Sequence, residues 1–131
     1  MKQFLAACLL IASPVMAQDG PLAPYLWENR PIVVFADSAQ DPRFSEQMDF
    51  LRQETEALVE RDVVILTDTN PSAQSDLRTK LRPRGFTLIL VGKDGGVKLR
   101  KASPWDVREI SRVIDKMPMR QREMREAGRL R

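Results

Sequence analysis

The hydrophobic pattern is densest between residues 86 and 101, where it predicts a β-hairpin. Residues 86–91 form an unbroken run of apolar and β-prone side chains, which is typical of a strand covered on both faces. The glycine-rich segment 92–96 supplies residues that tolerate a positive φ, as a tight reversal requires. Apolar and basic side chains then alternate over residues 97–100, which predicts a second strand with one exposed face.

Two more strands, separated by a helix, are predicted before the hairpin. Residues 32–36 and 63–66 are short β-branched runs, and we expect both to be buried strands, the second covered on both sides. Asp41 and Pro42 are a typical N-cap and first helical residue. The helix that follows is expected to bury one face, consisting of Phe44, Met48, Leu51, Thr55, Leu58 and Val59. A strand–helix–strand unit of this length implies a right-handed parallel crossover.

Shorter helical patterns flank the hairpin. A short helix is expected over residues 74–81, and residues 82–85 lead from it into the hairpin. Residues 103–106 predict the capping box of a last core helix, with Pro104 at its first position. Its buried stripe is Val107, Ile110, Val113, Ile114 and Met117. Pro118 is expected to stop or kink this helix, leaving residues 119–131 as a basic, weakly amphipathic tail.

The order of elements predicts an α/β fold of the thioredoxin-like class. Strand–helix, strand–helix and strand–strand–helix units in this order give a mixed four-stranded sheet with helices on both faces. We expect this domain at residues 31–118, with an irregular N-terminal arm at residues 18–30 packed against it.

The first 17 residues have the pattern of a secretory signal peptide. A positive residue, Lys2, precedes an apolar segment that is too short to span a bilayer, and small residues precede a predicted cleavage after Ala17. A buried N-terminal helix is the alternative. Lipid attachment at Cys8 is rejected, because most of the apolar segment follows that residue. We therefore expect a secreted or periplasmic product without a membrane-spanning segment.

Composition argues against thiol chemistry and histidine-dependent catalysis. Cys8 is the only cysteine and the sequence has no histidine, so the predicted mature chain lacks both residue types. We expect no catalytic residues, no cofactor and no metal site. The net charge is only +3, but residues 18–76 carry 12 acidic and 4 basic side chains, whereas residues 77–131 carry 16 basic and 6 acidic ones.

Several segments resemble a known family. They are Trp27 with Arg30-Pro31, residues 60–64, residues 91–100 (VGKDGGVKLR) and residues 114–120 (IDKMPMR). The chain resembles the bacterial domain-of-unknown-function family 4174 over about residues 25–125. The resemblance implies a thioredoxin-like, somewhat peroxiredoxin-like fold, related to domains in eukaryotic secreted sushi-repeat and coiled-coil-domain proteins. It implies no activity for any residue.

Comparison with redox-active thioredoxins points to a binding function. Thioredoxins place Cys-x-x-Cys between the first core strand and its helix, where this chain has the sulfur-free segment 37–43. Phe86 stands where thioredoxins have a cis-proline. We expect a non-catalytic binding or interaction module. The alternative is an enzyme related to peroxiredoxins or thiol oxidoreductases that uses an unrecognised mechanism.

Two sets of residues are candidate binding sites, each with a structural alternative. Asp37, Ser38 and Asp41 could form a polar rim, or they could end a strand and cap a helix. Basic residues on the hairpin edge and in the tail could dock an unknown protein or an anionic envelope component, with no nucleic acid expected. The alternative is a solvated edge strand and a frayed tail. The basic candidates are Lys98, Arg100, Arg120 and Arg122.

A copper site is a remote alternative. Met117, Met119 and Met124 could hold Cu(I), because thioethers are soft ligands. The neighbouring arginines disfavour a bound cation, and packing of the methionines against the core and tail is the expected role.

Overall fold

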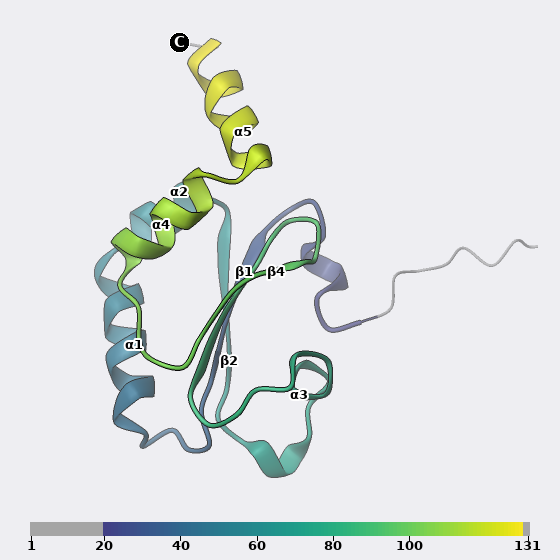
Figure 1. The fold of residues 1–131 in the computed structure, drawn as a ribbon, viewed down its shortest axis with the longest axis vertical. Coiled ribbons are helices and arrows are strands. Elements are labelled where there is room, and N and C mark those ends of the chain that lie inside the picture. Colours follow the sequence, from purple (N-terminus) through teal and green to yellow (C-terminus); the bar gives the residue numbers. More distant parts are fainter. Residues whose placement is uncertain (1–19, 130–131) are drawn as a thin grey trace, which may run out of the picture.

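A computed structural model of the chain describes residues 20–129. Its sheet has the strand order β2-β1-β3-β4 (Figure 1). The parallel pair β1–β2 and the antiparallel hairpin β3–β4 confirm the predicted mixed sheet, and β1 also pairs antiparallel with β3. The strands are β1 (Arg30–Phe35), β2 (Val63–Asp68), β3 (Thr87–Val91) and β4 (Val97–Lys101).

Helices cover both faces of the sheet, as predicted. One face is covered by α1 (Pro42–Gln53), α2 (Thr55–Glu60) and α4 (Val107–Asp115). The other face is covered by α3 (Asp76–Leu81) and the short 3-10 turn η1 (Ala23–Tyr25), as Figure 1 shows. A second 3-10 turn, η2 (Pro71–Ala73), precedes α3.

Each face of the sheet has its own core, because successive strand residues point to opposite sides. The larger core joins β1 and β3 to the helices α1, α2 and α4, through Ile32, Val34, Leu88, Leu90, Leu51, Leu58, Ile110 and Ile114. The smaller core joins the same strands to α3 and the N-terminal arm, through Val33, Phe35, Ile89, Val91, Leu22 and Leu81. These two cores fix β1 and β3 as the central strands.

The long first helix is divided, and its buried face differs from the prediction. Helical geometry breaks at Glu54, so α1 and α2 are separate. Val59, predicted to be buried, is 66% exposed, whereas the polar Gln47 is completely buried. The Gln47 side chain donates to the Trp105 carbonyl at 2.8 Å and accepts from the Trp105 N–H at 2.9 Å. Burial of this amide is tolerated because both of its polar groups are paired.

The prediction that β2 is covered on both sides was wrong. β2 is an edge strand that pairs only with β1, and its residues alternate between partial burial and exposure, with Ile65 36% exposed. A run of four apolar residues does not distinguish an edge strand from a central one.

The boundaries of two helices also differ from the prediction. α4 begins at Val107 with Asp106 as its N-cap, whose carboxylate accepts from the Glu109 N–H at 2.9 Å. Pro104 therefore lies outside this helix. α3 begins at Asp76, with Ser75 as its cap.

The predicted C-terminal tail is largely a helix. α4 ends at Asp115, and a new helix, α5 (Pro118–Arg129), begins at the proline that was expected only to stop or kink α4. Proline is well tolerated at the first position of a helix, where its missing N–H leaves no hydrogen bond unmade. Figure 1 shows α5 extending away from the sheet beyond α4. The predicted signal peptide and residues 18, 19, 130 and 131 lie outside the described residues.

Within residues 20–129, no helix is both long enough and apolar enough to cross a membrane.

Candidate functional site

The loop between β1 and α1 holds three of the predicted binding residues, and their contacts are local. The Asp41 carboxylate accepts from the Arg43 N–H at 2.9 Å and pairs with the Arg43 guanidinium at 3.0 Å, and these contacts lower the pKa of Asp41. The Ser38 hydroxyl donates to the Gln40 side chain at 2.6 Å and accepts from the Gln40 N–H at 3.1 Å. Asp37 is exposed. This geometry favours the role of helix cap for Asp41.

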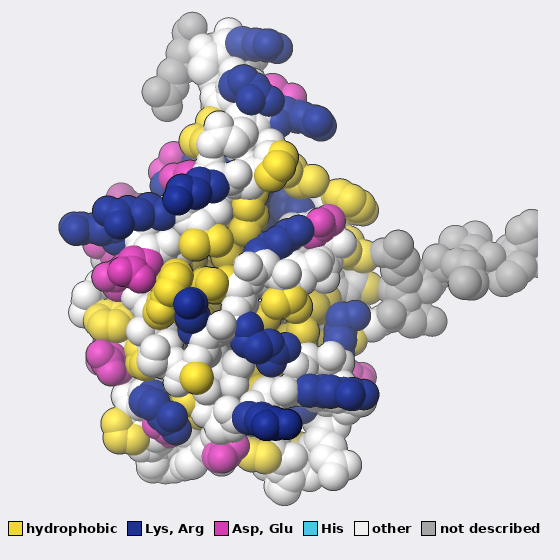
Figure 2. Space-filling model, in the orientation of Figure 1, with side chains coloured by type: hydrophobic (Ala, Val, Ile, Leu, Met, Phe, Trp, Pro, Cys, Tyr) yellow, Lys and Arg dark blue, Asp and Glu magenta, His cyan; other side chains and the backbone are white. Residues whose placement is uncertain are grey.

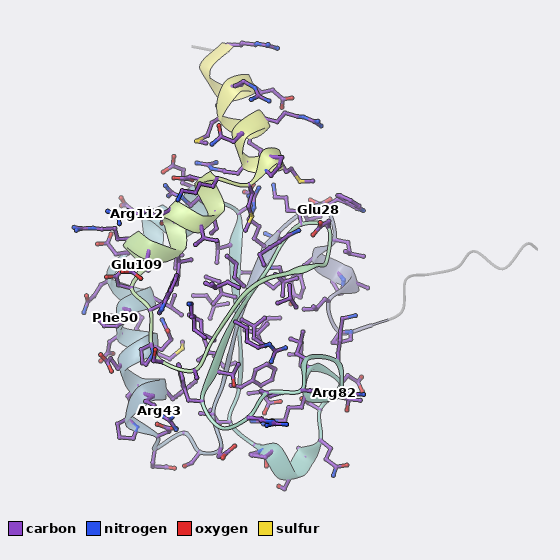
Figure 3. All side chains as sticks on the ribbon, viewed as in Figure 1. Glu28, Arg43, Phe50, Arg82, Glu109 and Arg112 are labelled. Atoms are coloured by element: carbon purple, nitrogen blue, oxygen red, sulfur yellow. The ribbon has the colours of Figure 1, made fainter. Side chains whose placement is uncertain are left out.

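A groove with three arginines lies at the same end of the sheet. Its lining residues, which we call the arginine groove, are Arg82, Arg84, Thr87, Arg100 and Ala102, around a volume of about 320 Å³. Thr87 pairs with Phe35, the last residue of β1, and this pairing places the groove beside the β1–α1 loop. Figure 3 labels Arg43 and Arg82 at this end of the sheet.

Backbone contacts hold the arginine groove in shape. Arg82 caps the C-terminus of α3 with a φ of 50°, and its N–H donates to the Arg78 carbonyl at 2.8 Å. Glycine is the usual residue at such a left-handed position. Arg100 donates to the Leu81 carbonyl at 2.6 Å, and the Thr87 hydroxyl donates to the Arg84 carbonyl at 3.1 Å.

The charges of the arginine groove are not neutralised internally. Within residues 20–129, no ion pair involves Arg82, Arg84 or Arg100, and no Asp or Glu lines the groove. Figure 2 shows Lys and Arg side chains spread over the lower half of this face, with few acidic side chains between them. The groove therefore presents an uncompensated positive field.

A neighbouring arginine has a different environment. Arg78 pairs with Asp68 at 2.9 Å, donates to the Ala36 carbonyl at 2.8 Å and stacks 5.3 Å from the centre of the Phe35 ring. Burial raises the pKa of Asp68, but hydrogen bonds from Ser75 and Arg78 outweigh it, so the pKa is lowered. These contacts link α3 to the ends of β1 and β2, and Asp68 neutralises the charge of Arg78.

The opposite end of the sheet carries a network of eight charged side chains, four of each sign. We call it the ion-pair network, and its members are Arg30, Arg61, Lys93, Arg120, Glu60, Asp62, Asp115 and Glu123. It joins the start of β1 and β2 to the β3–β4 turn and to the helices α2, α4 and α5.

Arg30 is the most deeply buried member of the ion-pair network. It is only 1% exposed, and its guanidinium makes two hydrogen bonds to the Glu123 carboxylate, at 3.0 and 3.1 Å. The Lys93 ammonium also reaches Glu123, at 2.7 Å, and Asp62, at 2.8 Å. Burial raises the pKa of Glu123, but the hydrogen bonds from Arg30 and Lys93 hold it below its ordinary value.

Arg120, one of the predicted docking residues, belongs to this network and is buried. It contacts Asp115 at 3.2 Å and Glu60 at 3.4 Å. Arg61 makes two further hydrogen bonds to Asp115, at 3.0 and 2.9 Å, and chiefly this contact lowers the pKa of Asp115. These side chains attach the first turns of α5 to the domain.

A pocket of about 380 Å³ lies beside the ion-pair network, between the β3–β4 turn and the junction of α4 with α5. We call it the junction pocket. Two of the predicted basic residues, Lys98 and Arg122, line it together with Met117, Pro118 and Met119. Met124 is not among its lining residues. The four predicted basic residues therefore do not form one surface, because Arg100 lines the arginine groove and Arg120 is buried in the network.

Sequence reasoning missed Arg30, Glu123, Arg82 and Arg84 as members of these sites. The turn that contains Arg82 and Arg84 was recognised only as a connection. Arg30 and Glu123 are 93 positions apart, and no local pattern links them. The one available signal is the position of Arg30, directly before a run of residues predicted to be a buried strand. An arginine that is buried with such a strand requires charged or polar partners.

The fold is similar to those of peroxiredoxins and thioredoxins of known structure. A reduced 2-Cys peroxiredoxin of Plasmodium vivax aligns with a TM-score of 0.59 and 16% identity, over 77% of this chain and 84% of that chain. Prx1a of Plasmodium yoelii aligns with a TM-score of 0.58 and 15% identity, over 77% of this chain and 80% of that chain. Chloroplastic thioredoxin z aligns with a TM-score of 0.52 and 24% identity, over 68% and 78%.

These similarities confirm the thioredoxin-like fold, and at such identities they show the fold alone. The family comparison covers most of the chain, since residues 21–123 match the domain of unknown function DUF4174. The chain belongs to this family, as the resemblance in the sequence indicated.

Proposed function

We propose that this chain is an exported, non-catalytic binding module that recognises an acidic segment of a partner protein through the arginine groove. One observation carries the proposal: three guanidinium groups from two separate segments line one groove that no carboxylate lines. Their charge is available to a partner, because the described residues do not neutralise it.

The chemistry of the arginine groove fits carboxylate ligands. Each guanidinium offers donors in a planar fork that matches a carboxylate, and such charge-assisted bonds are stronger than neutral ones. A hollow of about 320 Å³ accommodates protruding side chains. The neighbouring β4 is the last strand of the sheet, and an extended peptide could add to its outer edge. A protein segment with Asp or Glu side chains is therefore the occupant we propose.

A labelled hexaglutamate peptide tests this proposal by fluorescence anisotropy. We expect saturable binding that weakens as salt is added, because ions screen exposed charges. Arg84→Glu should weaken binding about tenfold, which corresponds to the loss of one charged hydrogen bond. Arg108→Glu changes charge equally at an exposed site on α4 and should leave the affinity nearly unchanged. Equal effects of the two variants, or equal binding of hexalysine, would contradict the proposal.

The alternative of a redox enzyme is tested separately. Residues 20–129 contain neither Cys nor His, and the sulfur-free β1–α1 loop supports a role without thiol chemistry. The purified protein should show no insulin reduction and no peroxidase turnover above a boiled control. Reproducible thiol-dependent turnover would overturn the non-catalytic assignment.

Export is part of the proposal and rests on the N-terminal sequence pattern. The mass of the exported protein should correspond to a chain that begins at Gln18 and carries no lipid. A mass that retains residues 1–17, or that includes a diacylglycerol on Cys8, would contradict it.

A further inference from the structure

We propose that the junction pocket binds a small amphipathic monoanion, such as a medium-chain carboxylate. This site is separate from the arginine groove, since it lies at the opposite end of the sheet and shares no residue with it. An experiment that contradicts one of the two proposals therefore leaves the other unaffected.

Three segments far apart in the sequence form the pocket. The β3–β4 hairpin contributes residues 92–94 and Lys98, the α4–α5 junction contributes residues 117–119 and Arg122, and β1 contributes Arg30. Gly92 leaves room for the Lys98 side chain of the same hairpin, because a Cβ at this position would lie 2.5 Å from the Lys98 Cε. The volume of about 380 Å³ is at the small end of the range for ligand pockets, which indicates a ligand of few atoms.

One wall of the junction pocket is apolar. Met117, Pro118 and Met119 form it, and Met117 also packs against the larger core of the domain. Methionine side chains are flexible and polarisable, so they adapt to apolar ligands of different shapes. This wall fits a short alkyl or aryl group.

The charges around the pocket leave one positive side chain without a partner. Arg30 and Lys93 are paired within the ion-pair network, and Lys98 pairs with Asp94 at 2.9 Å. Arg122 is exposed, and it takes part in none of the ion pairs formed among residues 20–129. A ligand with one anionic head group and an apolar body fits this arrangement, because the head group can pair with the Arg122 guanidinium while the body packs against the apolar wall.

The same arrangement disfavours Cu(I). Four cationic side chains line the pocket, and Met124, the third proposed thioether ligand, is not among the lining residues. A bound cation would be repelled where an anion would be attracted.

Three probes separate the contributions of charge and apolar contact. Decanoate, kept below its micellar concentration, carries both features, acetate carries only the head, and decyltrimethylammonium carries the same tail on a cation. In NMR titrations of the purified protein with labelled methionine methyl groups, decanoate should shift the Met117 and Met119 signals saturably. Acetate should bind at least about tenfold more weakly, because it lacks the apolar body, and decyltrimethylammonium should cause no saturable shift.

Matched variants on α5 complete the test. Arg122→Glu should weaken decanoate binding about tenfold, whereas Arg125→Glu, the same change at an exposed residue outside the pocket, should alter it less than about twofold. Circular dichroism checks that both variants are folded. The absence of saturable decanoate binding, equal binding of the two long-chain probes, or equal effects of the two variants would overturn the proposal, as would saturable Cu(I) binding by these methionines.

Discussion

The two ends of the sheet use arginine in opposite ways. At the start of β1, Arg30 is buried and its guanidinium is matched by the Glu123 carboxylate. At the other end, Arg84 is exposed and belongs to none of the ion pairs of the described domain. The same side chain thus stabilises the fold where a carboxylate meets it, and supplies a free charge where none does. The number of arginines in a sequence does not separate these two roles.

The opposed charges of the two sequence halves are partly neutralised inside the ion-pair network. Two of its contacts pair an acidic side chain of residues 18–76 with a basic side chain of residues 77–131: Glu60 with Arg120, and Asp62 with Lys93. The opposed charges of the two sequence halves therefore serve partly to form ion pairs within the fold, and not only to bind partners. The arginine groove and Arg122 are among the basic positions that these ion pairs do not neutralise.

The largest decrease in the free energy of unfolding is expected from Arg30→Ala, which tests the contrast between the two ends of the sheet. The substitution removes two hydrogen bonds from Glu123 and the Arg30 hydrogen bond from the Arg61 carbonyl, while Lys93 still pairs with Glu123. Breaking a buried pair costs about 3–5 kcal/mol when the remaining charge has no other partner. Because Lys93 remains, urea denaturation should show a loss of about 3 kcal/mol. Arg84→Ala is the matched control, and it should change the free energy of unfolding by no more than about 0.5 kcal/mol. Similar losses for the two variants would contradict the division of roles.

A smaller effect is expected from shortening α5. Deletion of residues 120–131 removes Arg120 and Glu123 from the ion-pair network, and it should lower the melting temperature by about 5 °C or more. Deletion of residues 125–131 leaves every member of the ion-pair network in place, and it should leave the melting temperature nearly unchanged. A frayed tail would give the same melting temperature for both deletions.

The smallest expected effect is a pH dependence of the free energy of unfolding, which arises from the carboxylates of the ion-pair network. The pKa of Glu123 is held below its ordinary value of 4.5, and that of Asp115 below 3.8. A lowered pKa contributes stability that is complete above the unfolded value and is lost as the pH falls through the folded value. The free energy of unfolding should therefore fall below about pH 4.5, and Glu123→Gln should flatten this dependence. An unchanged profile in Glu123→Gln would show that this carboxylate does not contribute.

Sequence patterns predicted the strands, the hairpin and the two-sided helix packing, because these depend on local periodicity and glycine placement. They did not predict the burial of Gln47, whose partner Trp105 is 58 positions away. They also did not reveal α5 as a helix, because Pro118 was interpreted as a stop rather than as a first helical residue.

The sites were less predictable than the fold. Arg100, a predicted binding residue, is exposed on β4, but Arg82 and Arg84, which line the same groove, come from a turn on another segment. Arg120 belongs to a strongly basic segment, yet it is buried because Asp115 and Glu60 meet it in space. Such pairings depend on the tertiary fold and leave no periodic signal.

The central claim is that the arginine groove, and not the network end, receives an acidic partner. Amide shift mapping with hexaglutamate tests it most directly, because both ends are observed in one titration. We predict saturable shifts centred on Arg82, Arg84, Thr87 and Arg100, with little change at Arg30 and along α5. Shifts centred on α5 and the β3–β4 turn, with the arginine groove unaffected, would contradict the account.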